Sequence, residues 1–300
     1  AARLIKPFLL YRTYHGSAMS GAVQRASIAA WNDEAHVEAN RALYRAKFAQ
    51  VTPLLARVLD VRLPDASFYL WAGVPPSCGG DELTYAQFNA KVHQAAGFLY
   101  DDLGVRRGDR VATIAYNHLD TVIIYFACWL IGAAVAPQNV AEDDRRIAFI
   151  LRNSEAKVCF ARAEYLERAE RIIHGDDEGL GAPNIRQIVE VGGTPCDDTL
   201  NFAQEIANRP DTFMSTDERP TLDDEALLVY TSGTTGAPKG VVLMQYNMLV
   251  DARGISDWQG ITGNQRMMCV LPIHHVNGTI VTLVTPLYVG ASVVLNRQYS

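Results

Sequence analysis

From residue 81 onward, short apolar runs alternate with longer stretches in which apolar residues recur every three or four positions. Short apolar runs are typical of buried strands, and a period near 3.6 residues is typical of an amphipathic helix. Their alternation predicts an α/β fold with a mostly parallel sheet and helices on both faces. Helices are expected over 85–103, 119–131, 142–153, 163–173 and 245–258, and from about 277. Strands are expected over 110–116, near 134, and over 157–161, 186–191, 226–230, 241–243, 267–271 and 291–295.

The first part of the chain follows a different, mainly helical pattern. A long helix is expected to begin at Asn32 or Asp33, because either side chain can cap it. A strand is expected over 67–74, and glycines and prolines then gather between residues 73 and 80. We therefore place a domain boundary there. The apolar face of the expected helix comprises Val37, Tyr44, Phe48, Val51 and Leu55.

Composition is that of a globular protein, with 49% hydrophobic and 20% charged residues among 300. The net charge of −6 argues against nucleic acid as a partner. Residues 1–76 carry 9 Lys and Arg against 5 Asp and Glu, whereas the remainder carries 18 against 28. This asymmetry fits two parts of different origin. The most apolar stretch, 121–136, is shorter than the ~20 residues that span a bilayer, so no membrane span is expected.

The cysteines are scattered, odd in number and without a CxxC pair. This spacing argues against a disulfide framework or a zinc site and favours a reducing, cytoplasmic location. The five are Cys78, Cys128, Cys159, Cys196 and Cys269.

A loop rich in hydroxyls and glycines separates two expected strands, and residues 231–240 read TSGTTGAPKG. Glycines let backbone N–H groups approach an anion, hydroxyls donate to phosphate oxygens, and a lysine adds positive charge. Pro238 before the lysine and a β-branched pair after it distinguish the loop from a Walker A motif, which opens a helix. The expected phosphate-binding residues are Thr231, Ser232, Gly233, Thr234, Thr235, Gly236 and Lys239.

This loop resembles the phosphate loop of the AMP-forming adenylating enzymes, which include acyl-CoA synthetases, peptide-synthetase adenylation domains and luciferases. A second stretch, 271–278, reads LPIHHVNG and resembles the family's next motif. His275 matches the family histidine, whereas His274 stands where phenylalanine is common. The resemblance places His275, Asn277 and Gly278 at an acyl and nucleotide pocket. The alternatives are a core role for His275 and a simple helix start at Asn277 and Gly278.

The resemblance covers about 81–300, which is less than half of such an enzyme. It implies the N-terminal domain of an AMP-forming carboxylate–CoA ligase that uses ATP, Mg²⁺, CoA and a small-molecule carboxylic acid. The family's magnesium-binding glutamate, ribose-binding aspartate, hinge and C-terminal lysine have no counterpart here. We therefore assign no catalytic residue and no metal ligand, and we expect the chain alone to be inactive. An adenylation domain feeding a carrier protein is the alternative within the family, and a non-catalytic nucleotide-binding module is another.

Three blocks near the start, 8–20, 28–37 and 64–72, resemble fold-type I pyridoxal-phosphate aminotransferases, close to the succinyldiaminopimelate aminotransferase group. The resemblance lacks that family's cofactor lysine, because Lys6 is not in a Ser-x-x-Lys context, and it lacks the substrate-binding arginine. Pyridoxal phosphate is therefore not expected, and a residual aminotransferase is the minor alternative. The expected organisation is a mainly helical α/β aminotransferase fragment over 1–76, a junction over 77–80 and a partial AMP-binding domain over 81–300, which suggests a chimeric chain.

Overall fold

The computed structural model describes residues 20–63, 71–73, 82–194, 199–215, 219–231 and 238–297. The chain divides into two compact units, Ala1–Gly79 and Gly80–Ser300. Each is described by itself.

The first unit contains two helices and a short antiparallel strand pair. These are α2 (Gly21–Asn32), α3 (Glu34–Leu55), β1 (Asp60–Arg62) and β2 (Trp71–Gly73). Asp33 caps α3, as predicted, by accepting a hydrogen bond from the Ala35 N–H at 3.1 Å. The apolar face expected for this helix is half-buried apart from Val51, and neither helix contains a buried residue. The described part of this unit therefore has no core of its own. Of the strand expected over 67–74, the structure describes β2 only.

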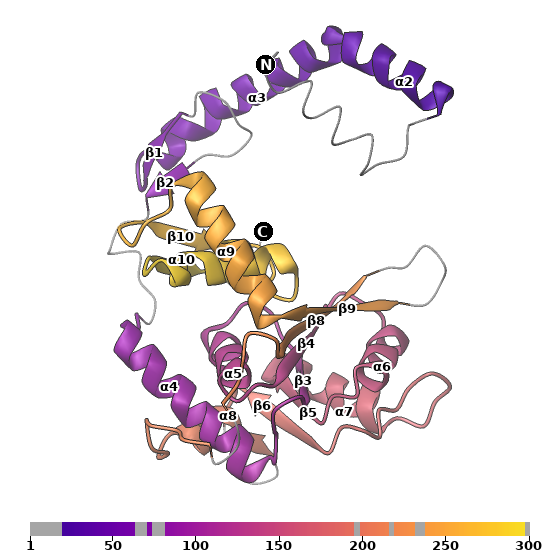
Figure 1. Ribbon diagram of the computed structural model, residues 1–300, viewed down its shortest axis with the longest axis vertical. Coiled ribbons are helices and arrows are strands. Elements are labelled where there is room, and N and C mark those ends of the chain that lie inside the picture. The colour runs from indigo at the N-terminus through magenta and orange to yellow at the C-terminus, as the bar shows by residue number, and fades with distance from the viewer. Residues whose placement is uncertain are drawn as a thin grey trace. The chain divides into compact units, whose positions relative to one another are not determined.

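The larger unit is built on a seven-stranded sheet in the order β7-β6-β5-β3-β4-β8-β9 (Figure 1). Neighbouring strands are parallel except β8 and β9, which form an antiparallel hairpin. The predicted strand–helix alternation and parallel sheet are confirmed. The strands are β3 (Arg110–Ile114), β4 (Ala134–Gln138), β5 (Val158–Arg162), β6 (Gln187–Val191), β7 (Leu200–Asn201), β8 (Glu225–Thr231) and β9 (Lys239–Met244).

Helices cover both faces of this sheet, because successive strand side chains point to opposite sides. In β3, Val111 joins a core formed with α4 and α5, whereas Ala112 and Ile114 join a second core formed with α6 and α7. Cys128 and Cys159 are buried in these two cores, one in each. The helices are α4 (Tyr85–Gly97), α5 (Leu119–Leu130), α6 (Asp144–Asn153), α7 (Leu166–His174), α8 (Phe202–Ile206), α9 (Gln245–Gln259) and α10 (Thr285–Tyr288).

A second sheet pairs β10 (Arg266–Cys269) in parallel with β11 (Ser292–Leu295). The connection between them contains a π-helical segment, Asn277–Val284, followed by α10. The predicted helix from about 277 is confirmed, although its first part has the wider π-helical turn. Among the described residues, no helix has both the length and the apolar character needed to cross a membrane.

Candidate functional site

The hairpin of β8 and β9 carries the stem of the predicted phosphate loop. Thr231 and Lys239 are directly opposite each other in the ladder, and both are exposed. The structure confirms a strand on each side of the loop. Residues 232–237 lie outside the described residues, and with them the predicted positions Ser232, Gly233, Thr234, Thr235 and Gly236. The two predicted residues that are described therefore mark the two ends of the loop.

Strand β8 is fixed in the sheet at its first residues. Ala226 and Leu227 are fully buried, and the Trp129 indole N–H donates to the Ala226 carbonyl at 2.7 Å. The Arg110 guanidinium pairs with the Glu225 carboxylate at 2.9 Å. Because β8 is parallel to β4, its carboxyl end lies at the edge where the parallel strands end. Ligands of open α/β sheets bind at that edge.

The histidine segment, residues 271–278, is attached to the same edge by Asn117, which follows β3. The Asn117 side-chain amide donates to the Leu271 carbonyl at 2.9 Å, and the Ile273 N–H donates to the Asn117 amide oxygen at 2.8 Å. Asn117 is only 4% exposed. It therefore connects the end of β3 to a segment more than 150 residues later in the chain. Sequence reasoning missed this residue, and its only signal was an asparagine directly after a strand.

The two neighbouring histidines have different environments. His275 is exposed, so it is not the core histidine of the alternative interpretation, whereas His274 is half-buried. Their ring centroids are 6.5 Å apart. Burial lowers the pKa of His274 to about 4, and His275 adds to the effect. His274 is therefore a neutral imidazole at pH 7.

This pKa predicts how stability depends on pH. The unfolded chain protonates His274 near its ordinary pKa of 6.5, but the folded chain resists protonation down to about pH 4. Between these values the unfolded state binds more protons, so the free energy of unfolding is expected to fall as the pH is lowered. Urea unfolding of the wild type and of His274→Phe at several pH values measures this contribution. The prediction requires a shallower pH dependence in the variant, and equal slopes would contradict it.

Gly278 shapes the turn that follows the histidines. It is buried, and a Cβ at this position would lie 2.1 Å from the Pro272 carbonyl oxygen. The His275 N–H donates to the same carbonyl at 3.0 Å, and the Thr279 N–H donates to the His275 carbonyl at 2.9 Å. The exposed Asn277 begins the π-helical segment. The structure thus brings His275, Asn277 and Gly278 together in one turn.

A charged cluster lies beside Asn117 at the ends of β3 and β5. The Tyr116 hydroxyl donates to Glu164 at 2.5 Å and accepts from Arg162 at 3.2 Å. Arg297 donates to the same Glu164 oxygen at 2.5 Å. Burial, and then the hydrogen bond to Glu164, raise the pKa of the Tyr116 hydroxyl. The Glu164 carboxylate therefore partly neutralises the buried Arg162 and also Arg297, close to the candidate site.

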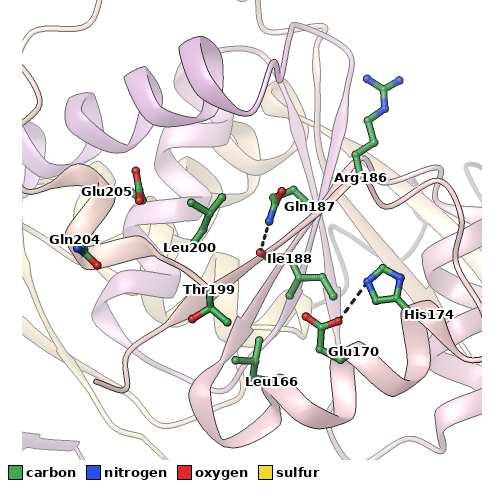
Figure 2. Close-up of a pocket in the computed structure, with 10 residues that line it drawn as sticks. All are labelled: Leu166, Glu170, His174, Arg186, Gln187, Ile188, Thr199, Leu200, Gln204 and Glu205. Carbon is green, nitrogen blue, oxygen red and sulfur yellow. Dashed lines mark hydrogen bonds and ion pairs between the residues drawn. The ribbon is translucent and has the colours of Figure 1, made fainter. Parts of the chain in front are cut away.

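A cavity of about 420 Å³ lies along β6 and β7, at the end of the strand order opposite β8 and β9 (Figure 2). The His174 Nε2 lies 3.3 Å from a Glu170 carboxylate oxygen, and the Gln187 side chain donates to the Ile188 carbonyl at 3.0 Å. Figure 2 shows both contacts as dashed lines. None of the predicted site residues lines this cavity, and four strands of the sheet lie between β6 and β9. It is lined by Leu166, Glu170, His174, Arg186, Gln187, Ile188, Thr199, Leu200, Gln204 and Glu205.

Within the described ranges, no three His, Cys, Asp or Glu side chains gather in a way that could hold a metal ion. In phosphate chemistry, Mg²⁺ is held largely by substrate phosphates and water, with few protein ligands.

Comparisons with known proteins bear on the larger unit. The chain is 30% identical over 232 residues to a crotonobetaine/carnitine–CoA ligase of Salmonella agona strain SL483, an alignment covering 75% of this chain and 43% of the relative. A crotonobetaine/carnitine–CoA ligase of Shigella dysenteriae serotype 1 is 29% identical over 246 residues, with 79% and 46% covered. The chain thus spans less than half the length of these relatives.

Solved structures share the fold. The anthranilate CoA ligase AuaEII, in complex with anthranoyl-AMP, superposes with a TM-score of 0.66 at 28% identity, over 73% of this chain and 41% of that one. The N-terminal domain of FACL13 from Mycobacterium tuberculosis gives a TM-score of 0.61 at 24% identity, over 73% and 51%. A family model described as AMP-binding enzyme matches residues 61–300. The chain therefore belongs to the family of AMP-binding enzymes and is homologous to acyl-CoA ligases.

Proposed function

We propose that this chain supplies the ATP-holding part of an AMP-forming carboxylate–CoA ligase. One observation carries the proposal: Thr231 and Lys239 face each other at the stem of a strand–loop–strand hairpin, at the carboxyl edge of a parallel sheet. In adenylation, a substrate carboxylate attacks the α-phosphorus of ATP and pyrophosphate leaves. The CoA thiol then attacks the acyl carbonyl of the adenylate, and AMP leaves. Lys239 and the loop from Thr231 to Gly236 would bind the phosphates that depart, while Mg²⁺ would arrive with ATP.

The turn of His275, Asn277 and Gly278 is proposed to border the carboxylic acid and the nucleotide. It is held at the same sheet edge as the hairpin through Asn117. The named CoA ligases among the relatives favour CoA over a carrier protein as the acyl acceptor. The cytoplasm is the proposed location, since the cysteines follow no disulfide pattern.

The proposal for residues 1–76 is different. We infer that they are an orphaned aminotransferase fragment that plays no part in the ligase reaction and binds no pyridoxal phosphate. The absence of buried residues in α2 and α3 supports a fragment separated from its original packing partners.

Binding measurements with ATP and with inorganic tripolyphosphate test the proposed function. Calorimetry at low salt should show saturable binding to the wild type and a loss of about tenfold or more in Lys239→Ala, because a charge-assisted contact is worth roughly 1.5–3 kcal/mol. Lys91→Ala, which removes a lysine from α4, is the matched control and should bind as the wild type does. ATP binding that is absent from the wild type, or unchanged in Lys239→Ala, would overturn the proposal. With carboxylic acids added, the chain alone is expected to release no pyrophosphate.

A further inference from the structure

Strand β8 is buried only as far as Val229, and Tyr230 and Thr231 extend beyond it toward the phosphate loop. β4 and β8, both fully described, share one register pair, Val135 with Leu227. The contacts of Trp129 and Arg110 hold only the first residues of β8, Ala226 and Glu225. Beyond Leu227, the strand pairs with β9 toward the phosphate loop (Figure 1). The ladder already holds the two stems together as far as Thr231 and Lys239. A further contact would therefore fix the orientation of the hairpin relative to the helices.

Tyr230 supplies contacts in two directions. Its hydroxyl donates to the side-chain oxygen of Asn153, the last residue of α6, at 2.7 Å. Its ring lies over Gly240, the residue opposite it on β9, because a Cβ on that glycine would be 3.1 Å from the tyrosine Cζ. Tyr230 therefore belongs to one stem of the loop, packs against the other, and is bonded to a helix of the second core.

The Tyr230 hydroxyl must keep its proton to donate to Asn153. Burial raises the pKa of Tyr230 to about 12, with Arg110 acting in the opposite direction. The group stays a protonated donor through the pH range in which ATP is used. A Cβ on Gly240 would lie 3.1 Å from both the Tyr230 ring and the Leu228 side chain, so both would have to shift slightly to make room for it.

We propose that Tyr230 is a positioning residue that fastens the loop end of the β8–β9 hairpin to α6, and so orients Thr231 and Lys239 relative to the sheet edge. The inference deepens the proposed function and rests on it for its consequence in phosphate binding. Tyr230 does not touch the phosphates in this proposal. It acts through the hairpin, which without this attachment would sample other orientations relative to α6.

Two measurements on the full chain test the proposal. Hydrogen exchange of the β8–β9 peptides, without ligand, should be faster in Tyr230→Phe and in Asn153→Ala than in the wild type, while exchange in β3 stays unchanged. Tripolyphosphate affinity should fall by about threefold to tenfold in either variant, the range expected for one net hydrogen bond. The double variant should be no weaker than either single one, because both remove the same contact.

The outcomes separate this inference from the proposed function. If Lys239→Ala abolishes binding but Tyr230→Phe binds and exchanges as the wild type does, the positioning role is wrong and the proposed function stands. If Tyr230→Phe lowers the free energy of unfolding without changing hairpin exchange or affinity, its role is purely structural and the inference is overturned. If the wild type binds no polyphosphate, the proposed function fails, and unchanged hairpin exchange in Tyr230→Phe would then refute the attachment as well.

Discussion

Replacing Gly278 with alanine is expected to displace the histidine segment and to lower the free energy of unfolding by about 3 kcal/mol, the upper end of the usual cost of overpacking. The new methyl group would lie 2.1 Å from the Pro272 carbonyl oxygen and 2.6 Å from its carbonyl carbon. Both atoms belong to the backbone, so no side-chain rotation can relieve the clash. Urea unfolding measures the loss, and hydrogen exchange over residues 271–278 measures the displacement.

Gly254 provides the matched control, because it lies inside α9 and a methyl group added there would have nothing within 4 Å of it. Alanine there should stabilise the chain by roughly 0.5–1 kcal/mol, since glycine is a poor helix former. If Gly278→Ala were as stable as the wild type and exchanged alike over 271–278, the close approach would not constrain this turn.

The same glycine shows what sequence reasoning can and cannot reach. The order of residues in 271–278 indicated a family motif, but it left open whether Gly278 lines a pocket or only starts a helix. The structure shows a buried glycine, required by contact with a carbonyl six residues earlier. No periodicity encodes such an approach, because it depends on how the chain folds back on itself.

The larger fold was predictable because its central strands β3, β4, β5, β6 and β8 are largely buried and its helices are amphipathic. Strand β7 and helix α8 were missed, since two and five residues are too few to show a period. The antiparallel direction of β9 follows from the short loop before it, because parallel strands need a crossover of a dozen or more residues. The phosphate-loop residues at 232–236 stay a prediction, as do the boundaries of the aminotransferase-like part.

Replacing Asn117 with alanine is expected to lower the free energy of unfolding about as much as Gly278→Ala does. Two backbone groups, the Leu271 carbonyl and the Ile273 N–H, would lose their partner near the buried end of β3. An unsatisfied buried group costs about 1–3 kcal/mol. The Ile273 N–H is buried and the Leu271 carbonyl is partly buried, so a loss of about 2–4 kcal/mol in the free energy of unfolding is expected. The histidine segment would also lose its attachment to the sheet edge. Its two rings would then become more accessible to water.

The pKa of His274 reports that release directly. In the wild type, burial holds it at about 4, and in Asn117→Ala it should rise toward the ordinary 6.5 as water reaches the ring. Asn184→Ala is the control, because Asn184 also donates to two carbonyls, those of Leu151 and Ala156, at 2.8 and 2.7 Å. It should lower stability while leaving the His274 pKa unchanged, as measured by NMR titration. A His274 pKa that stays near 4 in Asn117→Ala would show that the segment keeps its place without the asparagine, and that the turn alone positions the histidines.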